Sequence, residues 1–451
     1  MALRMIDALA RAEIADRLDR LRFGPLHLAI LLIASLGLFI DIAELSLNAV
    51  FTTSFPDTMA FVPKEGRSIL LGSVFAGGIV GAPLFGILAD RGGRRMAMQV
   101  SMAMLALCSL AGALATGPWA LVSFRLLAGV ALGAYPPLMA AWLTDILPPK
   151  RRARIILWGD ALGFLGAPAL VFAVYRLNGV ALPGFEGWRA ALCGGAMIAL
   201  VCNAGFWLLP ESPRWLAARG RYDAARRALA RFEGATTIVP QGTAGNPGDG
   251  ANAAPSSSLS AQQLRKRFTV ILVLYALRAV PTVVFPIMMG LALRRKGLDL
   301  NTSLVLVATS SFGGTLGTLF ASSIVERVER RAALAICGLL LTVCGLVFAA
   351  ADTVEVLLPA SSAFLTLGAI FGPILSIYAA EIMPTAVRAA TTSVAWGLTR
   401  LMSSILPAAL LPLLAGSATA AFMAVVLGSV VVSVIIIGGF GPRQLPSRPI
   451  V

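Results

Sequence analysis

Long apolar segments dominate this chain and restrict what it can fold into. A helix needs about 20 apolar residues to cross the hydrocarbon core of a bilayer, and the sequence contains twelve segments of this kind. They lie at about residues 26–52, 67–90, 95–116, 118–142, 152–177, 188–209, 266–292, 301–325, 331–351, 354–381, 388–414 and 418–440. The sequence therefore predicts an all-α membrane protein with twelve transmembrane helices.

The composition agrees with this prediction. Charged residues make up 13% of the chain, against about 25% in soluble domains. The net charge of +15 is spread in short runs between the apolar segments and forms no continuous basic patch. We therefore expect the lipid bilayer as a partner and no nucleic acid.

Residue types that hold metals or act in catalysis are scarce. The five cysteines lie in apolar segments without C-x-x-C spacing, and we interpret them as small buried hydrophobic residues. The single histidine, His27, makes a histidine metal site or a Ser-His pair improbable. With no nucleotide-binding loop either, we expect no enzyme activity, no metal and no cofactor other than protons as a coupling ion.

The polar segments divide the chain into five regions. These are an N-terminus (1–25), a six-helix bundle (26–209), a basic helix-prone segment with a linker (210–265), a second six-helix bundle (266–440) and a tail (441–451). We expect an amphipathic helix at 210–232 on the membrane surface, followed by a disordered tether at 234–258, which is rich in Gly, Ala, Pro and Ser.

The distribution of Lys and Arg predicts the orientation. Most of them fall on the side that holds both termini and the 210–267 segment, and few fall on the other side. Because cytoplasmic loops carry the excess of basic residues, we expect both termini to be cytoplasmic. The protein would lie in the cell membrane, which in a bacterium is the inner membrane.

The two six-helix regions repeat one another. A shift of 236 positions lays Asp145 over Glu381 and Arg152 over Arg388. The same shift relates Asp90-Arg91 to Glu326-Arg327, Arg94-Arg95 to Arg330-Arg331, Pro137 to Pro373 and Pro148 to Pro384. Each half has six spans, so the repeats are parallel, and such transporters place their site between the halves near mid-membrane.

Several motifs resemble those of the major facilitator superfamily. GILADRGGRR (86–95) resembles the signature loop between helices 2 and 3, and RLLAGVALG (125–133) resembles the helix-4 pattern. PESPRW (210–215) and EIMPTAVR (381–388) resemble elements of its sugar-porter and metabolite-porter branches. The resemblance implies the major facilitator fold, two bundles that alternate access to a central site, and a monomer.

Within that superfamily, the aromatic acid:proton symporters resemble this chain at more charged positions than sugar porters do. Their helix-1 Asp-Gly-x-Asp pattern is similar to Asp41-Ile-Ala-Glu44, and their helix-4 and helix-11 charges match the positions Arg125, Asp145, Arg388 and Arg400. The chain lacks the glycine of that pattern and a helix-8 histidine. It also lacks the glutamine-rich helix-7 motif of sugar porters and has Arg278 there.

Charged residues within the spans predict a proton site. Each such charge costs about 2.5–3.5 kcal/mol on insertion scales and needs a partner or a task. Asp41 and Glu44 are three residues apart and share a helix face, and Arg125 would tune their protonation. We expect Glu44, at the resembled second-acid position, to be the chief proton carrier; the alternative is a packing triad without transport function.

A second group predicts the substrate site. Arg400 could bind a carboxylate in bidentate fashion, and Trp396, four residues earlier on the same face, could stack on a ring. Under the 236 shift, Asp160 and Phe164 occupy the equivalent positions, and Arg278 is a further candidate. The alternatives are that Arg400 snorkels or pairs with a helix-1 acid, and that Asp160 pairs with an arginine.

A third group sits at helix ends. We expect these residues to form conformational latches that bridge helices on the cytoplasmic face and hold the outward-open state, the alternative being solvated loop charge. They are Asp90, Arg94, Asp145 and Arg152 in the first half, and Glu326, Arg330, Glu381 and Arg388 in the second.

Together, these features predict a secondary active transporter. The sequence predicts proton-coupled symport of a small organic, aromatic carboxylate by alternating access. Three alternatives stay open: a proton-driven efflux antiporter for drugs or metabolites, a sugar-type facilitator, and a transporter-like sensor that signals through 210–267.

Overall fold

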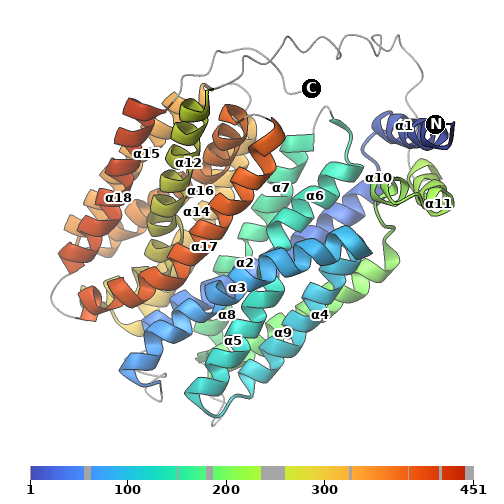
Figure 1. Cartoon of the computed structure of the whole chain (residues 1–451). Coiled ribbons are helices and arrows are strands. Elements are labelled where there is room, and N and C mark those ends of the chain that lie inside the picture. The colour runs from blue at the N-terminus through green and yellow to red at the C-terminus, as the bar shows by residue number, and fades with distance from the viewer. Residues whose placement is uncertain are drawn as a thin grey trace.

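The computed structural model describes residues 2–54, 62–149, 152–178, 186–234, 260–324, 328–383, 385–415 and 419–441. Helices are the only regular secondary structure in these ranges, as predicted. Two bundles of long helices stand side by side, and the short helices α1, α10 and α11 gather at one end of the first bundle (Figure 1). We call this end the α10 end and the opposite end the far end.

The first half comprises α2 (Pro25–Ser54), α3 (Lys64–Gly92), α4 (Arg94–Ala113), α5 (Pro118–Leu132), α6 (Tyr135–Ile146), α7 (Arg152–Phe164), α8 (Gly166–Asn178) and α9 (Gly187–Leu208). The second comprises α12 (Ala261–Ala279), η2 (Val280–Val284), α13 (Phe285–Arg295), α14 (Leu300–Ile324), α15 (Arg330–Ala350), α16 (Val354–Ile382), α17 (Thr385–Ala415) and α18 (Thr419–Phe440). Outside both halves lie α1 (Ala2–Asp19), α10 (Pro213–Ala218) and α11 (Tyr222–Gly234).

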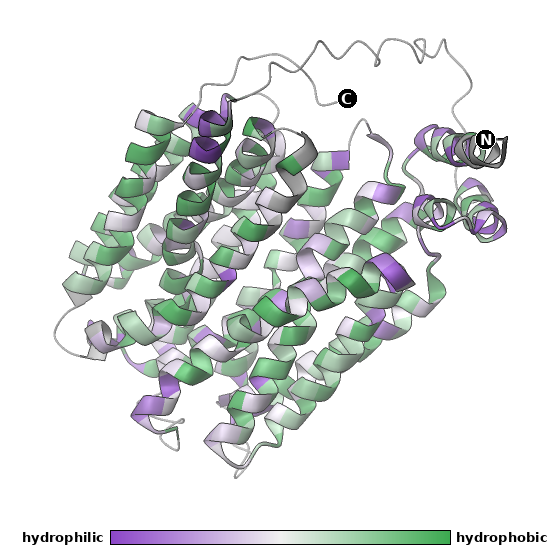
Figure 2. Cartoon of the chain, viewed as in Figure 1, coloured by the Kyte–Doolittle hydropathy of each residue, from purple (hydrophilic) through white to green (hydrophobic). Residues whose placement is uncertain are grey.

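The twelve predicted spans are confirmed. Within the described residues, twelve helical segments are long and apolar enough to cross a membrane. Figure 2 shows hydrophobic residues along these helices and hydrophilic residues gathered on α1, α10 and α11. Three spans are interrupted, between α5 and α6, between α7 and α8, and at the π-helical turn η2, where Pro281 cannot donate a backbone hydrogen bond.

The predicted internal repeat is confirmed by packing. The first four spans of each half begin 236 residues apart: Pro25 and Ala261, Lys64 and Leu300, Arg94 and Arg330, Pro118 and Val354. A Cβ at Gly81 would lie 2.0 Å from the Val130 carbonyl oxygen, and one at the equivalent Gly317 would lie 2.2 Å from that of Thr366. Both halves therefore use glycine to bring their second and fourth spans into close contact.

A side-chain hydrogen bond is repeated as well. Ser101 Oγ donates to the Ala131 carbonyl over 2.7 Å, and Cys337 Sγ donates to the Leu367 carbonyl over 3.2 Å. Both pairs obey the shift of 236. The two halves therefore share internal contacts as well as helix order, which a chance similarity of motifs would not give.

The segment after the sixth span differs from its prediction. Instead of one surface helix over 210–232, it forms α10 and α11, separated by Gly220 with φ of +72°. Leu229 and Phe232 are buried in a cluster that includes Ile14 and Leu18 of α1. The apolar face of α11 is thus covered by protein and not by the membrane surface, because α1 supplies the partner. The predicted tether at 234–258 lies, apart from Gly234, outside the described residues.

The two halves meet toward the far end. Thr52 Oγ1 of α2 donates to the Ile287 carbonyl of α13 over 2.5 Å, and Ser404 Oγ of α17 donates to the Gly72 carbonyl of α3 over 3.1 Å. The Phe172 and Phe312 rings are also 6.4 Å apart across the α8–α14 contact. The halves are joined near the far end and also along α7 and α14, where Phe164 lies against Gly314.

Candidate functional site at mid-membrane

Glu44 on α2 lies at the centre of a buried polar cluster. Arg125 Nη1 of α5 donates to Glu44 Oε2 over 2.6 Å, and Arg125 Nη2 donates to the Glu44 carbonyl and to Asn48 Oδ1, each over 3.0 Å. Ser109 Oγ of α4 donates to the other carboxylate oxygen of Glu44. The predicted contact between Arg125 and a helix-1 acid is thus present, and it falls on Glu44.

Two members of this cluster are missed by the sequence reasoning. Asn48 follows Glu44 by four residues and so shares its helix face, a spacing that could have drawn attention to it. Ser109 carries no such signal, because only the packing of α4 on α2 and α5 brings its hydroxyl to Glu44. Buried hydroxyl and amide groups of this kind complete the hydrogen bonding of an ion pair.

Asp41, one turn earlier on α2, is in a different situation. Its side chain is 1% exposed, and Oδ1 has no hydrogen-bond partner among the described residues. The guanidinium that acts on it most strongly is that of Arg400 on α17, in the other half. Glu44 therefore contacts Arg125, as expected, whereas the charge that acts on Asp41 is that of Arg400, in line with the alternative that Arg400 pairs with a helix-1 acid.

Trp396 on α17 lies between two arginines. The Arg278 guanidinium carbon is 5.1 Å from the Trp396 ring centroid and 5.5 Å from that of Tyr275. The Arg400 guanidinium carbon is 6.0 Å from the Trp396 ring. Thr399 Oγ1 donates to the Tyr275 carbonyl over 2.9 Å and ties α17 to α12. The structure thus brings together three of the predicted substrate residues.

The other two predicted substrate residues lie on α7. Asp160 is half-buried and forms no hydrogen bond or ion pair with the rest of the described chain. Phe164 packs against α14, where a Cβ at Gly314 would lie 2.8 Å from its ring. The alternative expectation that an arginine pairs with Asp160 finds no such contact in the described residues.

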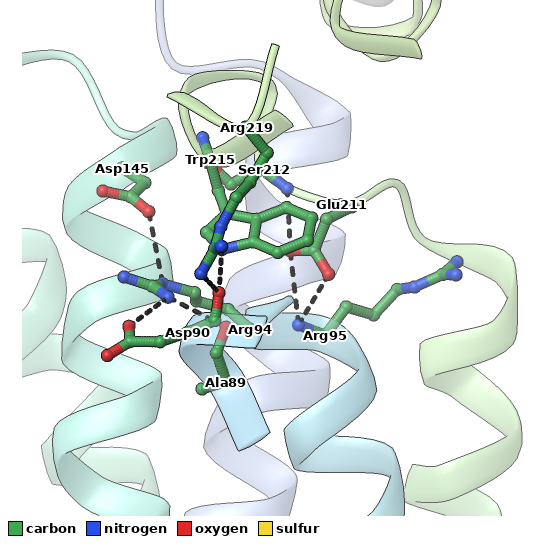
Figure 3. A network of polar contacts seen from close by, with 9 residues as sticks. All are labelled: Ala89, Asp90, Arg94, Arg95, Asp145, Glu211, Ser212, Trp215 and Arg219. Carbon is green, nitrogen blue, oxygen red and sulfur yellow. Dashed lines mark hydrogen bonds and ion pairs between the residues drawn. The ribbon is translucent and has the colours of Figure 1, made fainter. Parts of the chain in front are cut away.

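The predicted latch residues form contacts at the α10 end, and Figure 3 shows those of Asp90, Arg94 and Asp145. Arg94 Nη1 donates over 2.9 Å to both the Ala89 carbonyl and Asp90 Oδ1, and its Nε lies 3.8 Å from Asp145. The equivalent residues of the second half, Arg330 and Glu381, are 3.6 Å apart. Both ion pairs join helices of the same half, and neither pair bridges the two halves in this state.

The remaining latch residues have different positions. Arg152 donates to the Leu147 carbonyl over 3.0 Å and lies 3.8 Å from Asp19 of α1. Glu326 and the side chain of Arg388 lie outside the described residues.

Glu211 belongs to the same network, although the sequence reasoning gives it no role. It accepts from the backbone N–H of Arg95 over 3.1 Å and of Ser212 over 2.9 Å. Burial raises the pKa of the Glu211 carboxyl above its ordinary value. Its position within PESPRW is the signal that could have identified it. As Figure 3 shows, it fixes α10 to the start of α4.

Two cavities lie away from these residues. One of about 230 Å³ at the far end is lined by α8, α14 and α16, with Tyr175, Asn301 and Thr309 among its walls. The other, of about 430 Å³, is lined by α12 and α17 at the α10 end, with Phe268 and Val394 among its walls.

Comparison with known proteins places the chain in a family. YyaJ of Bacillus subtilis, a protein named for metabolite transport, is 26% identical over 434 residues, covering 94% of this chain and 92% of its own. The niacin transporter NiaP of Acinetobacter baylyi is 29% identical over 49% of each chain, and a gallate transporter of Pseudomonas putida is 29% identical over 57% of each.

Solved structures show the same fold. The partially occluded inward-open xylose transporter XylE of E. coli has a TM-score of 0.72 at 16% identity, over 93% of this chain and 98% of its own. The family model for "Sugar (and other) transporter" matches residues 52–443. This chain therefore belongs to the Sugar (and other) transporter family, within the major facilitator superfamily, and is a multi-pass membrane transporter.

Proposed function

We propose that the protein imports a small aromatic carboxylate together with a proton, by alternating access. The observation that supports this most is a segregation of charge at mid-membrane. Apart from the Arg125–Glu44 ion pair, the mid-membrane charges of the first half are the acids Asp41 and Asp160, and those of the second half are Arg278 and Arg400. A carboxylate substrate complements the arginine side, and a proton complements the acid side.

The internal repeat relates the positions of these charged residues in the two halves. Under the shift of 236, Phe164 corresponds to Arg400 and Asp160 to Trp396, while Arg278 corresponds to the residue that follows Asp41. Two similar bundles have thus acquired opposite charges at equivalent levels. Since buried charges are costly unless they have a task, this arrangement supports a site that binds a cation and an anion together.

Coupling would pass through Arg400. While Asp41 is ionised, it holds the guanidinium of Arg400 electrostatically and competes with an incoming carboxylate. A proton on Asp41 removes that competition and frees Arg400 for the substrate, so that each ligand favours binding of the other. This is the condition for symport.

The contacts support Asp41 and not Glu44 as the chief proton carrier. Both carboxylate oxygens of Glu44 accept hydrogen bonds, from Arg125 and Ser109, and the group is thus engaged within the first half. Oδ1 of Asp41 has no such bond in the described chain. Glu44 would then hold Arg125 in place and position α5 beside α2.

The substrate class rests on Trp396 and on the relatives. An indole beside a guanidinium suits a ligand with an aromatic ring and a carboxylate. The names of two relatives specify niacin and gallate, which are both aromatic carboxylates.

The orientation follows from the basic residues. Arginines of α1, α10 and α11 lie at the α10 end, so this end faces the cytoplasm under the positive-inside rule. The contacts near the far end would then close the outer side of the transporter, which we expect to act as a monomer.

Uptake into proteoliposomes tests the proposal. Labelled 4-hydroxybenzoate and nicotinate are supplied with and without an imposed inward proton gradient. We expect gradient-stimulated uptake of at least one acid, and loss of the stimulation in Asp41→Asn. Absence of uptake of both acids under every gradient would overturn the aromatic-acid assignment. Uptake that ignores the gradient would replace symport by facilitated diffusion.

A further inference from the structure

Arg278 has a buried guanidinium without a counter-ion in the described chain. It lies at the end of α12, immediately before the π-helical turn η2. Its Nε and Nη1 atoms are buried and have no hydrogen-bond partner among the described residues. A buried cation is strongly unfavourable without a counter-charge, so the Arg278 guanidinium is suited to bind an anion.

The neighbours of Arg278 cannot supply that anion. They are two aromatic rings, those of Tyr275 and Trp396, and Gly372 of α16, where an added Cβ would lie 3.4 Å from Nη2. The groups that act on Arg278 electrostatically are the Tyr275 hydroxyl and, with the opposite sign, Arg400, which is a second cation. Two guanidinium groups thus share one region around Trp396.

None of the three mid-membrane acids of the first half forms an ion pair with Arg278 in the described chain, and Asp160 forms no ion pair at all there. Glu44 forms an ion pair with Arg125, and the positive charge that acts on Asp41 is that of Arg400. A substrate with one carboxylate would occupy Arg400 once Asp41 takes a proton, and Arg278 would remain unpaired.

We infer that the substrate is an aromatic compound with two acid groups, one bound by Arg400 and the other by Arg278. This inference rests on the proposed function and specifies its substrate class. The two arginines come from different helices, α17 and α12, and each lies within 6.0 Å of the Trp396 ring. A ring that packs on the indole would present one carboxylate to each guanidinium, and each contact could be bidentate.

Binding of matched acids to the purified full-length protein in nanodiscs tests this inference. Benzoate carries one carboxylate, and isophthalate and terephthalate carry two on the same ring. Isothermal titration calorimetry at pH 6.5 should show at least one dicarboxylate binding about tenfold or more tightly than benzoate, the gain expected of one added charged contact. Equal affinity for all three acids would overturn the inference, and this comparison needs no variant.

The variant Arg278→Gln gives a second test. It should bring the ratio of dicarboxylate affinity to benzoate affinity close to one, whatever it does to benzoate binding itself. Arg265→Gln, which changes an exposed arginine on the same helix, is the matched control and should leave every affinity unchanged. If Arg278→Gln lowers the affinities for benzoate and for the dicarboxylate by the same factor, Arg278 does not bind the second acid group, and the inference is overturned.

The two proposals fail in different ways. Gradient-driven uptake of benzoate with no preference for the dicarboxylates would leave the proposed function standing and overturn the two-acid substrate. Absence of binding by all three acids and absence of aromatic-acid uptake would overturn both.

Discussion

Arg125 and Glu44 form an ion pair over 2.6 Å, with side chains only 2% and 4% exposed. The pair joins α5 to α2 inside the first half, and Asn48 and Ser109 complete its hydrogen bonding. Desolvation of two charges offsets much of their attraction, but loss of one partner leaves the other charge buried alone. The intact pair therefore adds little net stability to the first half, but the loss of either partner is strongly destabilising.

The first prediction concerns this ion pair. Arg125→Gln should destabilise the protein by about 3–5 kcal/mol, because Glu44 then remains buried without a counter-ion. The double variant Glu44→Gln with Arg125→Gln should recover part of that loss. Thermal unfolding in detergent, followed by tryptophan fluorescence, checks both. An Arg125→Gln protein that unfolds at the wild-type temperature would contradict the prediction.

The second prediction separates proton coupling from substrate exchange. Asp41→Asn mimics the protonated acid, so it should abolish gradient-stimulated uptake while retaining exchange of labelled for unlabelled substrate across the membrane. Both rates can be measured in the same proteoliposomes. Asp223→Asn, at an exposed position on α11, serves as the control and should alter neither. Retained gradient stimulation in Asp41→Asn would exclude Asp41 as the proton carrier.

The third prediction compares two glycines of α3. A Cβ at Gly81 would lie 2.0 Å from the Val130 carbonyl oxygen, whereas one at Gly86 would meet nothing within 4 Å. Gly81→Ala should therefore cost about 1–3 kcal/mol by forcing α3 away from α5. Gly86→Ala should be neutral or stabilise by up to about 1 kcal/mol, because alanine favours helix. Equal unfolding temperatures for the two variants would show that α3 and α5 need no close approach.

The fourth prediction concerns the docking of α1. Arg17 donates from Nε and Nη2 to the two carboxylate oxygens of Glu233 on α11, over 2.9 and 2.8 Å. Arg17→Glu should loosen α1 and speed amide hydrogen exchange in it, more strongly at low salt because exposed charges are screened by salt. Adding Glu233→Arg to the same protein should restore slow exchange. If the charge swap fails to rescue, the apolar contacts and not the ion pair hold α1.

Much of the fold follows from the sequence for a simple physical reason. A bilayer cannot hydrogen-bond a backbone, so every apolar segment of sufficient length must become a helix. The shift of 236 then relates each span of the first half to its equivalent in the second. Gly81 and Gly317 lie where the second and fourth spans of each half pack closely. The split of 210–232 into two helices is decided by Gly220, a local helix-stop signal. The burial of α11 against α1 is a tertiary contact that no local pattern expresses.

The sequence by itself also determined which residues carry mid-membrane charge, because each such residue is conspicuous in an apolar span. Only the tertiary structure decided which charges meet. Helical periodicity puts Asp41 and Glu44 on one face of α2. The packing of α5 on α2 brings Arg125 into an ion pair with Glu44, and the packing of α17 brings the charge of Arg400 to act on Asp41. Such pairings depend on distances between helices far apart in the chain, and these are fixed by the packing of whole bundles, not by the spacing of residues along any one helix.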